Sequence, residues 1–132
     1  MKKYLLDTNV IIDFLKGDKN TIEIFKSIKN YPLFISVITI AEYHYGALRS
    51  FKVQETIDLF LEFSKAADFI ELPIDKEVAK KFAEIQAELS KKGKLRPAFD
   101  LLIASTCIVN DCILTTKNRK DFVGIAELKI LK

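Results

Sequence analysis

Apolar positions follow two alternating patterns along this chain. Short, largely apolar runs are typical of buried strands and cover residues 4–6, 33–36, 69–72, 112–115 and 128–131. Between them, apolar residues recur at helical spacing over residues 10–15, 19–29 and 53–67. A further helical face is marked by Ile38, Ala41, Tyr45 and Leu48. The chain is therefore predicted to alternate strands with helices.

The second half of the chain carries clearer helix boundaries. Asp75 has the position of an N-cap before a helix that Gly93 ends, and the apolar stripe of that helix is Val78, Phe82, Ile85 and Leu89. Another buried helix is predicted to start near Phe99. Strands that alternate with helices form parallel sheets covered on both faces. We therefore predict an α/β fold with a central parallel sheet of about four or five short, doubly buried strands.

Length and composition narrow the class of protein. The chain has 132 residues, and 49% of them are hydrophobic. Residues 1–132 are therefore expected to form one domain with a sizeable hydrophobic core. No apolar run is long enough to cross a bilayer, and the N-terminus lacks the pattern of a signal peptide. A cytoplasmic protein is expected. Cys107 and Cys112 fit this compartment as reduced, buried thiols, because their spacing is not that of a zinc or redox pair.

Four acidic residues stand out by their positions. Asp7 ends an apolar strand and Asp100 lies at the start of an apolar helix, whereas acids are rarely buried without a partner. With Glu42 and Asp121, they would repel one another if they converged, and Mg²⁺ or Mn²⁺ would relieve that repulsion. Alternatively, each acid merely caps a helix or pairs with a lysine.

The remaining chemistry is limited. His44 is the single histidine, and a helix would point it away from Glu42, so catalysis is expected to rely on carboxylates. The formal charge is +3, which is mildly basic. Basic residues cluster before two of the acids, at Lys91, Lys92, Lys94 and Arg96 and at Lys117, Arg119 and Lys120. These residues either contact a polyanion or form a solvated face.

Four segments resemble the motifs of PIN-domain ribonucleases. They are Asp7-Thr-Asn-Val-Ile-Ile-Asp13, Ser36-Val-Ile-Thr-Ile-Ala-Glu42, Phe99-Asp-Leu-Leu-Ile-Ala-Ser105 and Thr115-Thr-Lys-Asn-Arg-Lys-Asp-Phe122. They occur in order over almost the whole chain. A short domain of this kind is most similar to the VapC toxins of toxin–antitoxin pairs.

The resemblance implies a single PIN-like domain and a Mg²⁺- or Mn²⁺-dependent endoribonuclease. Asp7 and Asp100 would be the principal metal ligands, Glu42 a bridging or water-orienting carboxylate, and Asp121 a ligand of a second metal. At this fourth position, Asn118 is the alternative to Asp121. The chemistry needs no histidine, since metals on carboxylates can activate water and stabilise the leaving oxygen.

Other residues have weaker assignments. Asn9 and Thr116 are expected to fix carboxylate rotamers or, alternatively, to serve in helix caps and turns. Asp13 is expected to be solvated or salt-bridged. Tyr43 and Tyr45 either stack on a base or pack in the protein. The residues expected to touch RNA are Lys94, Arg96, Lys117 and Arg119.

The resemblance also implies partners. They are an RNA substrate, a VapB-like antitoxin that blocks the site with a basic side chain, and a second copy of the chain. The apolar face with Tyr43, Tyr45, Leu48 and Phe51 is the hypothesis for that homodimer. No membrane partner is expected.

Three other functions remain open. A haloacid-dehalogenase-type phosphatase would need a second aspartate where this chain has Asn9. A receiver-like module would cluster more acids after the first strand. A catalytically silent PIN-like domain would keep the fold and only bind a partner.

Overall fold

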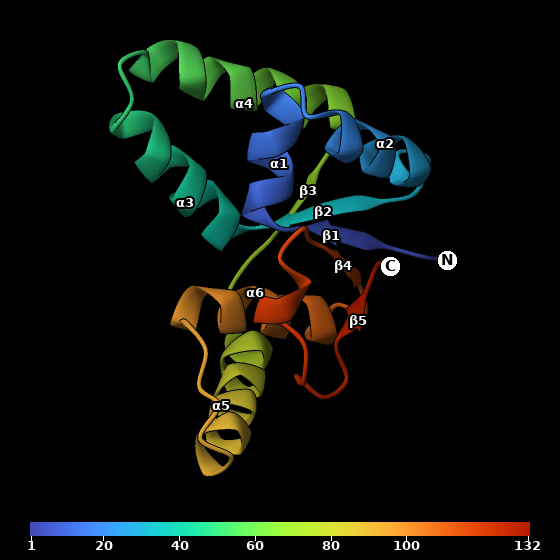
Figure 1. Cartoon of the computed structure of the whole chain (residues 1–132), viewed down its shortest axis with the longest axis vertical. Helices are drawn as coiled ribbons and strands as arrows, with labels where there is room; N and C mark the ends of the chain where they lie inside the picture. Colours follow the sequence, from blue (N-terminus) through green and yellow to red (C-terminus); the bar gives the residue numbers. More distant parts are fainter.

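A five-stranded parallel sheet forms the centre of the molecule, as the computed structural model of residues 1–132 shows (Figure 1). Its strands are β1 (Tyr4–Leu6), β2 (Leu33–Ser36), β3 (Ile70–Leu72), β4 (Ile113–Thr115) and β5 (Lys129–Ile130). They lie in the order β3-β2-β1-β4-β5, and all pairs are parallel. The predicted α/β fold is confirmed.

The sheet has its switch point between β1 and β4. From β1 the chain adds β2 and β3 on one side, and it then returns to add β4 and β5 on the other. Leu6 pairs with Thr115, so both strands end at the same level. Ligands of open α/β sheets bind outside the carboxyl ends of the strands at such a point. The fold therefore places Asp7, directly after β1, where a ligand-binding site is expected.

Six helices cover the two faces of the sheet. They are α1 (Thr8–Leu15), α2 (Lys19–Ile28), α3 (Val37–Leu48), α4 (Val53–Ala67), α5 (Lys76–Lys91) and α6 (Ala98–Val109). In Figure 1 the first four lie on one side of the sheet, whereas α5 and α6 lie on the other. None of the six has both the length and the apolar character needed to cross a membrane.

Strand alternation divides the core into two clusters. Tyr4 and Leu6 point to the α1–α4 side, where they pack with residues such as Val10 and Phe60. Leu5 points to the other side and packs with Leu101. Burial of each large apolar side chain contributes about 1.5–3 kcal/mol, so both helix layers are held firmly against β1.

Most predicted boundaries agree with the structure to within about two residues. Asp75 caps α5 as predicted by accepting a hydrogen bond from the backbone N–H of Val78 at 2.9 Å. Gly93 follows α5 with a φ of +66°, a conformation that favours glycine. Both cysteines are buried and free, and burial raises the pKa of the Cys112 thiol to about 11.

Two expectations about burial were wrong. Tyr45 was placed on the apolar face of its helix, yet α3 buries Thr39, Tyr43 and Ala47. Tyr45 is on the opposite, exposed side. In addition, β3 is not buried on both faces, because Ile70 and Glu71 are exposed at the edge of the sheet.

Candidate active site

Asp7 connects β1 to α1. Its side chain accepts a 2.8 Å hydrogen bond from the backbone N–H of Thr8 and acts as the N-cap of α1. The helix dipole therefore favours a negative charge there. Asp7 is nevertheless only 5% exposed. Burial raises the pKa of Asp7, with a smaller contribution from the charges of Glu42 and Asp121.

Thr116 fixes the other oxygen of Asp7. Its hydroxyl donates a 2.8 Å hydrogen bond to Asp7 Oδ2 and accepts one from the backbone N–H of Asn118 at 3.0 Å. These bonds tie the end of β4 to the end of β1. The predicted role of Thr116 as a support for a carboxylate is consistent with this geometry.

Glu42 reaches the same edge of the sheet from α3. Its Oε1 accepts a 2.6 Å hydrogen bond from the hydroxyl of Thr8. The Thr8 hydroxyl is also hydrogen-bonded to that of Thr39, at 3.1 Å, and both threonines are buried. Thr8 thus separates Asp7 from Glu42 and holds Glu42 in place. This contact was not predicted, although Thr8 lies inside the quoted Asp-Thr-Asn motif.

Asp100 comes from the opposite face of the sheet, in the first turn of α6. Burial is the main reason that the pKa of Asp100 is raised to about 6. Repulsion from Asp7, Asp121 and Glu42 adds to this shift. The charges of the other three acids thus raise the pKa of Asp100, which is the effect expected of carboxylates that lie close together.

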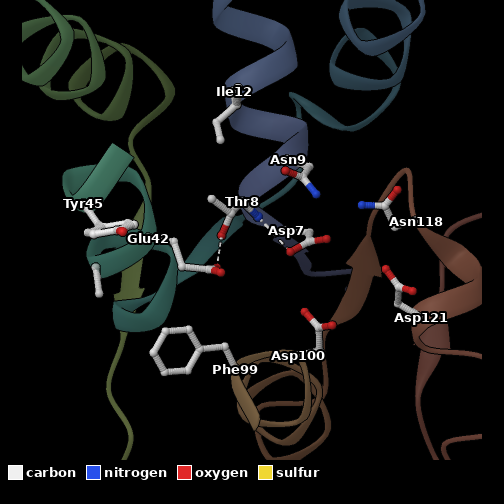
Figure 2. Close-up of a pocket in the computed structure, with 11 residues that line it drawn as sticks. Asp7, Thr8, Asn9, Ile12, Glu42, Tyr45, Phe99, Asp100, Asn118 and Asp121 are labelled. Carbon is white, nitrogen blue, oxygen red and sulfur yellow. Dashed lines mark hydrogen bonds between the residues drawn. The ribbon is translucent and has the colours of Figure 1, made fainter. Parts of the chain in front are cut away.

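The fourth motif forms a short 3₁₀ helix, η1 (Arg119–Asp121), after β4. Asn118 and Asp121 both line a cavity of about 770 Å³ together with Asp7, Glu42 and Asp100. Figure 2 shows the four carboxylates around one space, with Asn118 above Asp121. Both candidates for the fourth position, Asn118 and Asp121, thus have side chains that line the cavity.

The donor set fits a hard divalent cation. Four carboxylates supply oxygen ligands, and their mutual repulsion disfavours the ionised, ion-free site. No three of these acids are grouped closely enough to enclose one ion in this structure. An ion would therefore take much of its coordination from water, which Mg²⁺ usually retains.

Asn9 lies in the wall of the cavity. Its side chain lines the cavity, but it makes no hydrogen bond to a carboxylate. It is also not the cap of α1, because Asp7 has that position. His44 is exposed and does not line the cavity, in agreement with carboxylate chemistry.

Three of the four cations expected to touch RNA have partners within the protein. Lys117 pairs with Asp13 at 3.1 Å and with Asp18 at 2.9 Å, which confirms a salt bridge for Asp13. Arg96 donates to the Val123 carbonyl, and Arg119 donates to the Leu131 carbonyl. Lys94 is exposed and forms no ion pair. In this structure the ammonium group of Lys117 therefore joins two parts of the protein, and it is not free of ion pairs.

The two tyrosines beside Glu42 have different environments. Tyr43 is 8% exposed, stacks on Phe60 with ring centroids 4.7 Å apart and donates to the Thr56 carbonyl. Tyr45 is 61% exposed and lines the acidic cavity. Phe99 also lines the cavity, a position not predicted for it. Its place directly before Asp100 in the third motif was the available signal.

Known proteins resemble this chain over nearly its full length. A model of the PIN domain family matches residues 4–128. Ribonuclease VapC2 of Haemophilus influenzae is 31% identical over 131 residues, which cover 98% of this chain and 96% of that protein. Ribonuclease VapC1 of Methanocaldococcus jannaschii is 34% identical over 125 residues, with coverage of 95% and 82%.

A solved structure agrees with these relatives. VapBC2 from Rickettsia felis, bound to a DNA fragment from their promoter, matches with a TM-score of 0.89 and 27% identity, covering 98% of this chain and 97% of that one. The phosphatase and receiver alternatives are set aside by this family match. With its fold, motif order and relatives in agreement, this chain belongs to the PIN-domain family and, within it, to the VapC ribonucleases.

Proposed function

We propose that this chain is a VapC-type endoribonuclease that hydrolyses RNA phosphodiester bonds with the help of Mg²⁺ or Mn²⁺. The observation that carries the proposal is the convergence of four carboxylates on one cavity at the switch point of the sheet. Relatives named ribonucleases support the reaction. The raised pKa of Asp100 supports the need for a cation.

Asp7 and Asp100 are the proposed principal ligands. They come from opposite layers of the fold, and the charge of Asp7 raises the pKa of Asp100, so the two carboxylates lie within electrical reach of each other. The Thr116 and Thr8 hydrogen bonds hold Asp7 in one orientation and favour its ionised form. Asp7 is therefore prepared to bind a cation without reorganising.

Glu42 and Asp121 complete the proposed machinery. A bound divalent cation would neutralise charge on the phosphate and favour ionisation of the attacking water. Glu42, fixed by Thr8, would accept a proton from that water or orient it. Asp121 and the nearby Asn118 would supply polar side chains on the β4 side of the cavity.

Cleavage of a structured RNA pool tests this proposal. Wild type, Asp7→Asn and Asp100→Asn would be compared in Mg²⁺, in Mn²⁺ and in a chelator. Asp58→Asn is a matched control, because Asp58 is an exposed acid on α4, away from the cavity. We expect cutting by wild type and by the control only, and only with metal. Equal cutting by all four proteins would contradict the mechanism, whereas cutting by none would indicate the silent-domain alternative.

We further propose that a VapB-type antitoxin controls the enzyme. Solved complexes named VapBC support this partner. A second, more apolar groove of about 430 Å³ shares Ile12 and Glu42 with the acidic cavity. An antitoxin segment in this groove could place a basic side chain among the acids, where it would neutralise them. A complex purified with its antitoxin should then bind Mn²⁺ more weakly than the free enzyme.

The chain is also proposed to form a homodimer. Leu48, the last residue of α3, and Phe51, in the turn that follows, are exposed large apolar residues of the surface predicted for the dimer. Tyr43 is removed from that surface, because it is buried in the core. Light scattering should give the mass of two chains, and a monomeric mass at micromolar concentration would contradict the dimer.

A further inference from the structure

Two aromatic rings form part of the wall of the acidic cavity. Tyr45 projects from α3 and Phe99 from the first turn of α6, and the two elements lie on opposite sides of the sheet (Figure 1). Both rings line the cavity that holds the four carboxylates. Figure 2 shows them at the same end of this cavity, beside Glu42, with Asp121 at the far end.

Both rings are largely exposed to solvent. Tyr45 is 61% exposed and Phe99 is 50% exposed. Neither ring takes part in the aromatic clusters of the interior, whereas Tyr43 stacks on Phe60. Packing therefore does not explain why two rings stand beside four acids. A ligand with both an anionic group and a flat apolar group does explain it.

A nucleotide has this combination of groups. If the carboxylates and a cation hold the phosphate at one end of the cavity, the attached base falls near the other end. Aromatic side chains bind bases of any sequence through stacking, because every base has a flat face. Arg49 lies over one face of the Tyr45 ring, with its guanidinium carbon 5.4 Å from the ring centre, so it adds positive charge there and leaves the other face for a base.

We propose that Tyr45 and Phe99 form a base-stacking subsite beside the scissile phosphate. This inference rests on the proposed function of the carboxylates. A base inside a duplex has both faces covered by its neighbours, so it cannot stack on these rings. The subsite thus selects single-stranded segments by stacking, without reading the sequence.

Tryptophan fluorescence tests the subsite without requiring catalysis. The chain contains no tryptophan, so Phe99→Trp and Tyr45→Trp each introduce a single reporter. Leu61→Trp, on the exposed surface of α4, is the matched control. Circular dichroism would establish that each variant is folded. The probes are a short single-stranded RNA of random sequence, the same RNA annealed to its complement, and an abasic ribose-phosphate oligomer, all with Ca²⁺.

We expect the single-stranded RNA to quench both cavity reporters and to leave the Leu61→Trp reporter unchanged. The duplex and the abasic oligomer should quench neither cavity reporter. Quenching by the abasic oligomer equal to that by RNA would overturn the proposal, because the phosphate alone would then account for it. Absence of quenching by any RNA would also overturn it.

Cleavage kinetics separate this inference from the proposed function. For a single-stranded RNA that wild type cuts, Tyr45→Ala and Phe99→Ala should each raise KM by about 5- to 150-fold, the usual range for loss of one stacked base. Tyr45→Phe should restore KM, and Leu61→Ala should not change it. An unchanged KM in both cavity variants would overturn the subsite while leaving the nuclease intact. Quenching without any cutting by wild type would instead overturn the nuclease and retain the subsite.

A protein interface is the competing explanation for exposed rings. Light scattering on Tyr45→Ala addresses it directly. If this substitution converts a dimer to a monomer and leaves KM unchanged, the ring belongs to a contact between copies and the proposal is wrong. An unchanged mass together with a raised KM supports the base-stacking subsite.

Discussion

The hydroxyl of Thr116 donates a 2.8 Å hydrogen bond to Asp7 Oδ2 across 109 positions of the sequence. It joins the ends of β4 and β1, the two strands at which the order of the sheet reverses. The bond also lowers the pKa of Asp7, in opposition to the effect of burial. One hydroxyl therefore both orients Asp7 and favours the charged form that a cation needs.

Replacing Thr116 by valine should weaken metal binding. Thr116→Val keeps the shape of the side chain but removes the donor, so the pKa of Asp7 should rise further. Loss of such an outer hydrogen bond typically reduces metal affinity about 10- to 100-fold. Calorimetry with Mn²⁺ measures the change, and Thr116→Ser should retain most of the affinity. Equal affinity in Thr116→Val and wild type would contradict the role assigned to this bond.

Thr8→Val should act on the reaction through Glu42. It removes the 2.6 Å hydrogen bond to Glu42 Oε1 and leaves the carboxylate without its orienting partner. We expect kcat for RNA cleavage to fall by about tenfold, at the lower end of such effects, with little change in KM. Thr8→Ser should restore kcat. A loss confined to KM would show that Thr8 contributes to RNA binding instead.

Lys94 and Lys117 should differ in the salt dependence of RNA binding. Lys117 is already paired with Asp13 and Asp18, whereas Lys94 is exposed without an ion pair. Each cation that contacts a phosphate adds about 1 to the salt slope of the binding constant. We therefore expect Lys94→Met to reduce this slope by about 1 and Lys117→Met to leave it unchanged. The reverse result would mean that Lys117 exchanges its carboxylate partners for the substrate.

Asp100 should make the stability of the metal-free enzyme depend on pH. Its pKa is raised to about 6 in the folded chain, above the ordinary value of 3.8. The folded state therefore binds the proton more tightly than the unfolded state, and the contribution of Asp100 to stability falls as pH rises between these values. We expect Asp100→Asn to gain on the order of 1 to 2 kcal/mol relative to wild type across this window, after discounting for partial exposure.

Urea unfolding in a chelator, between acidic and neutral pH, measures that difference. Addition of Mg²⁺ at neutral pH should stabilise wild type more than Asp100→Asn, because the ion binds the folded carboxylates. A constant difference between the two proteins at every pH would contradict the raised pKa of Asp100.

The order of strands and helices was predictable because periodicity is a local property. Convergence of the four acids was also predictable, since Asp7 follows a strand and parallel strands end at one edge. Which face of α3 is exposed was not predictable, because Tyr43 and Tyr45 are both apolar enough to lie in the core. Only the packing of α3 on Phe60 decides between them.

The contacts that refine the site depend on how elements are rotated against one another. The Thr8–Glu42 bond requires α1 and α3 to present particular faces, which no local pattern specifies. The ion pairs of Lys117 likewise join the segment after β4 to α1 and the start of α2. The sequence alone identified the four acids, but it could not show which neighbouring side chains hold them in position.

Metal titration by calorimetry tests the central claim most directly, namely that the acidic cavity binds a divalent cation through Asp7 and Asp100. Wild type, Asp7→Asn, Asp100→Asn and the control Asp58→Asn would be titrated with Mn²⁺ at neutral pH. We predict saturable binding to wild type and to the control, with affinity at least about tenfold weaker in each cavity variant. Equal affinity in all four proteins would place the ion elsewhere and contradict the account.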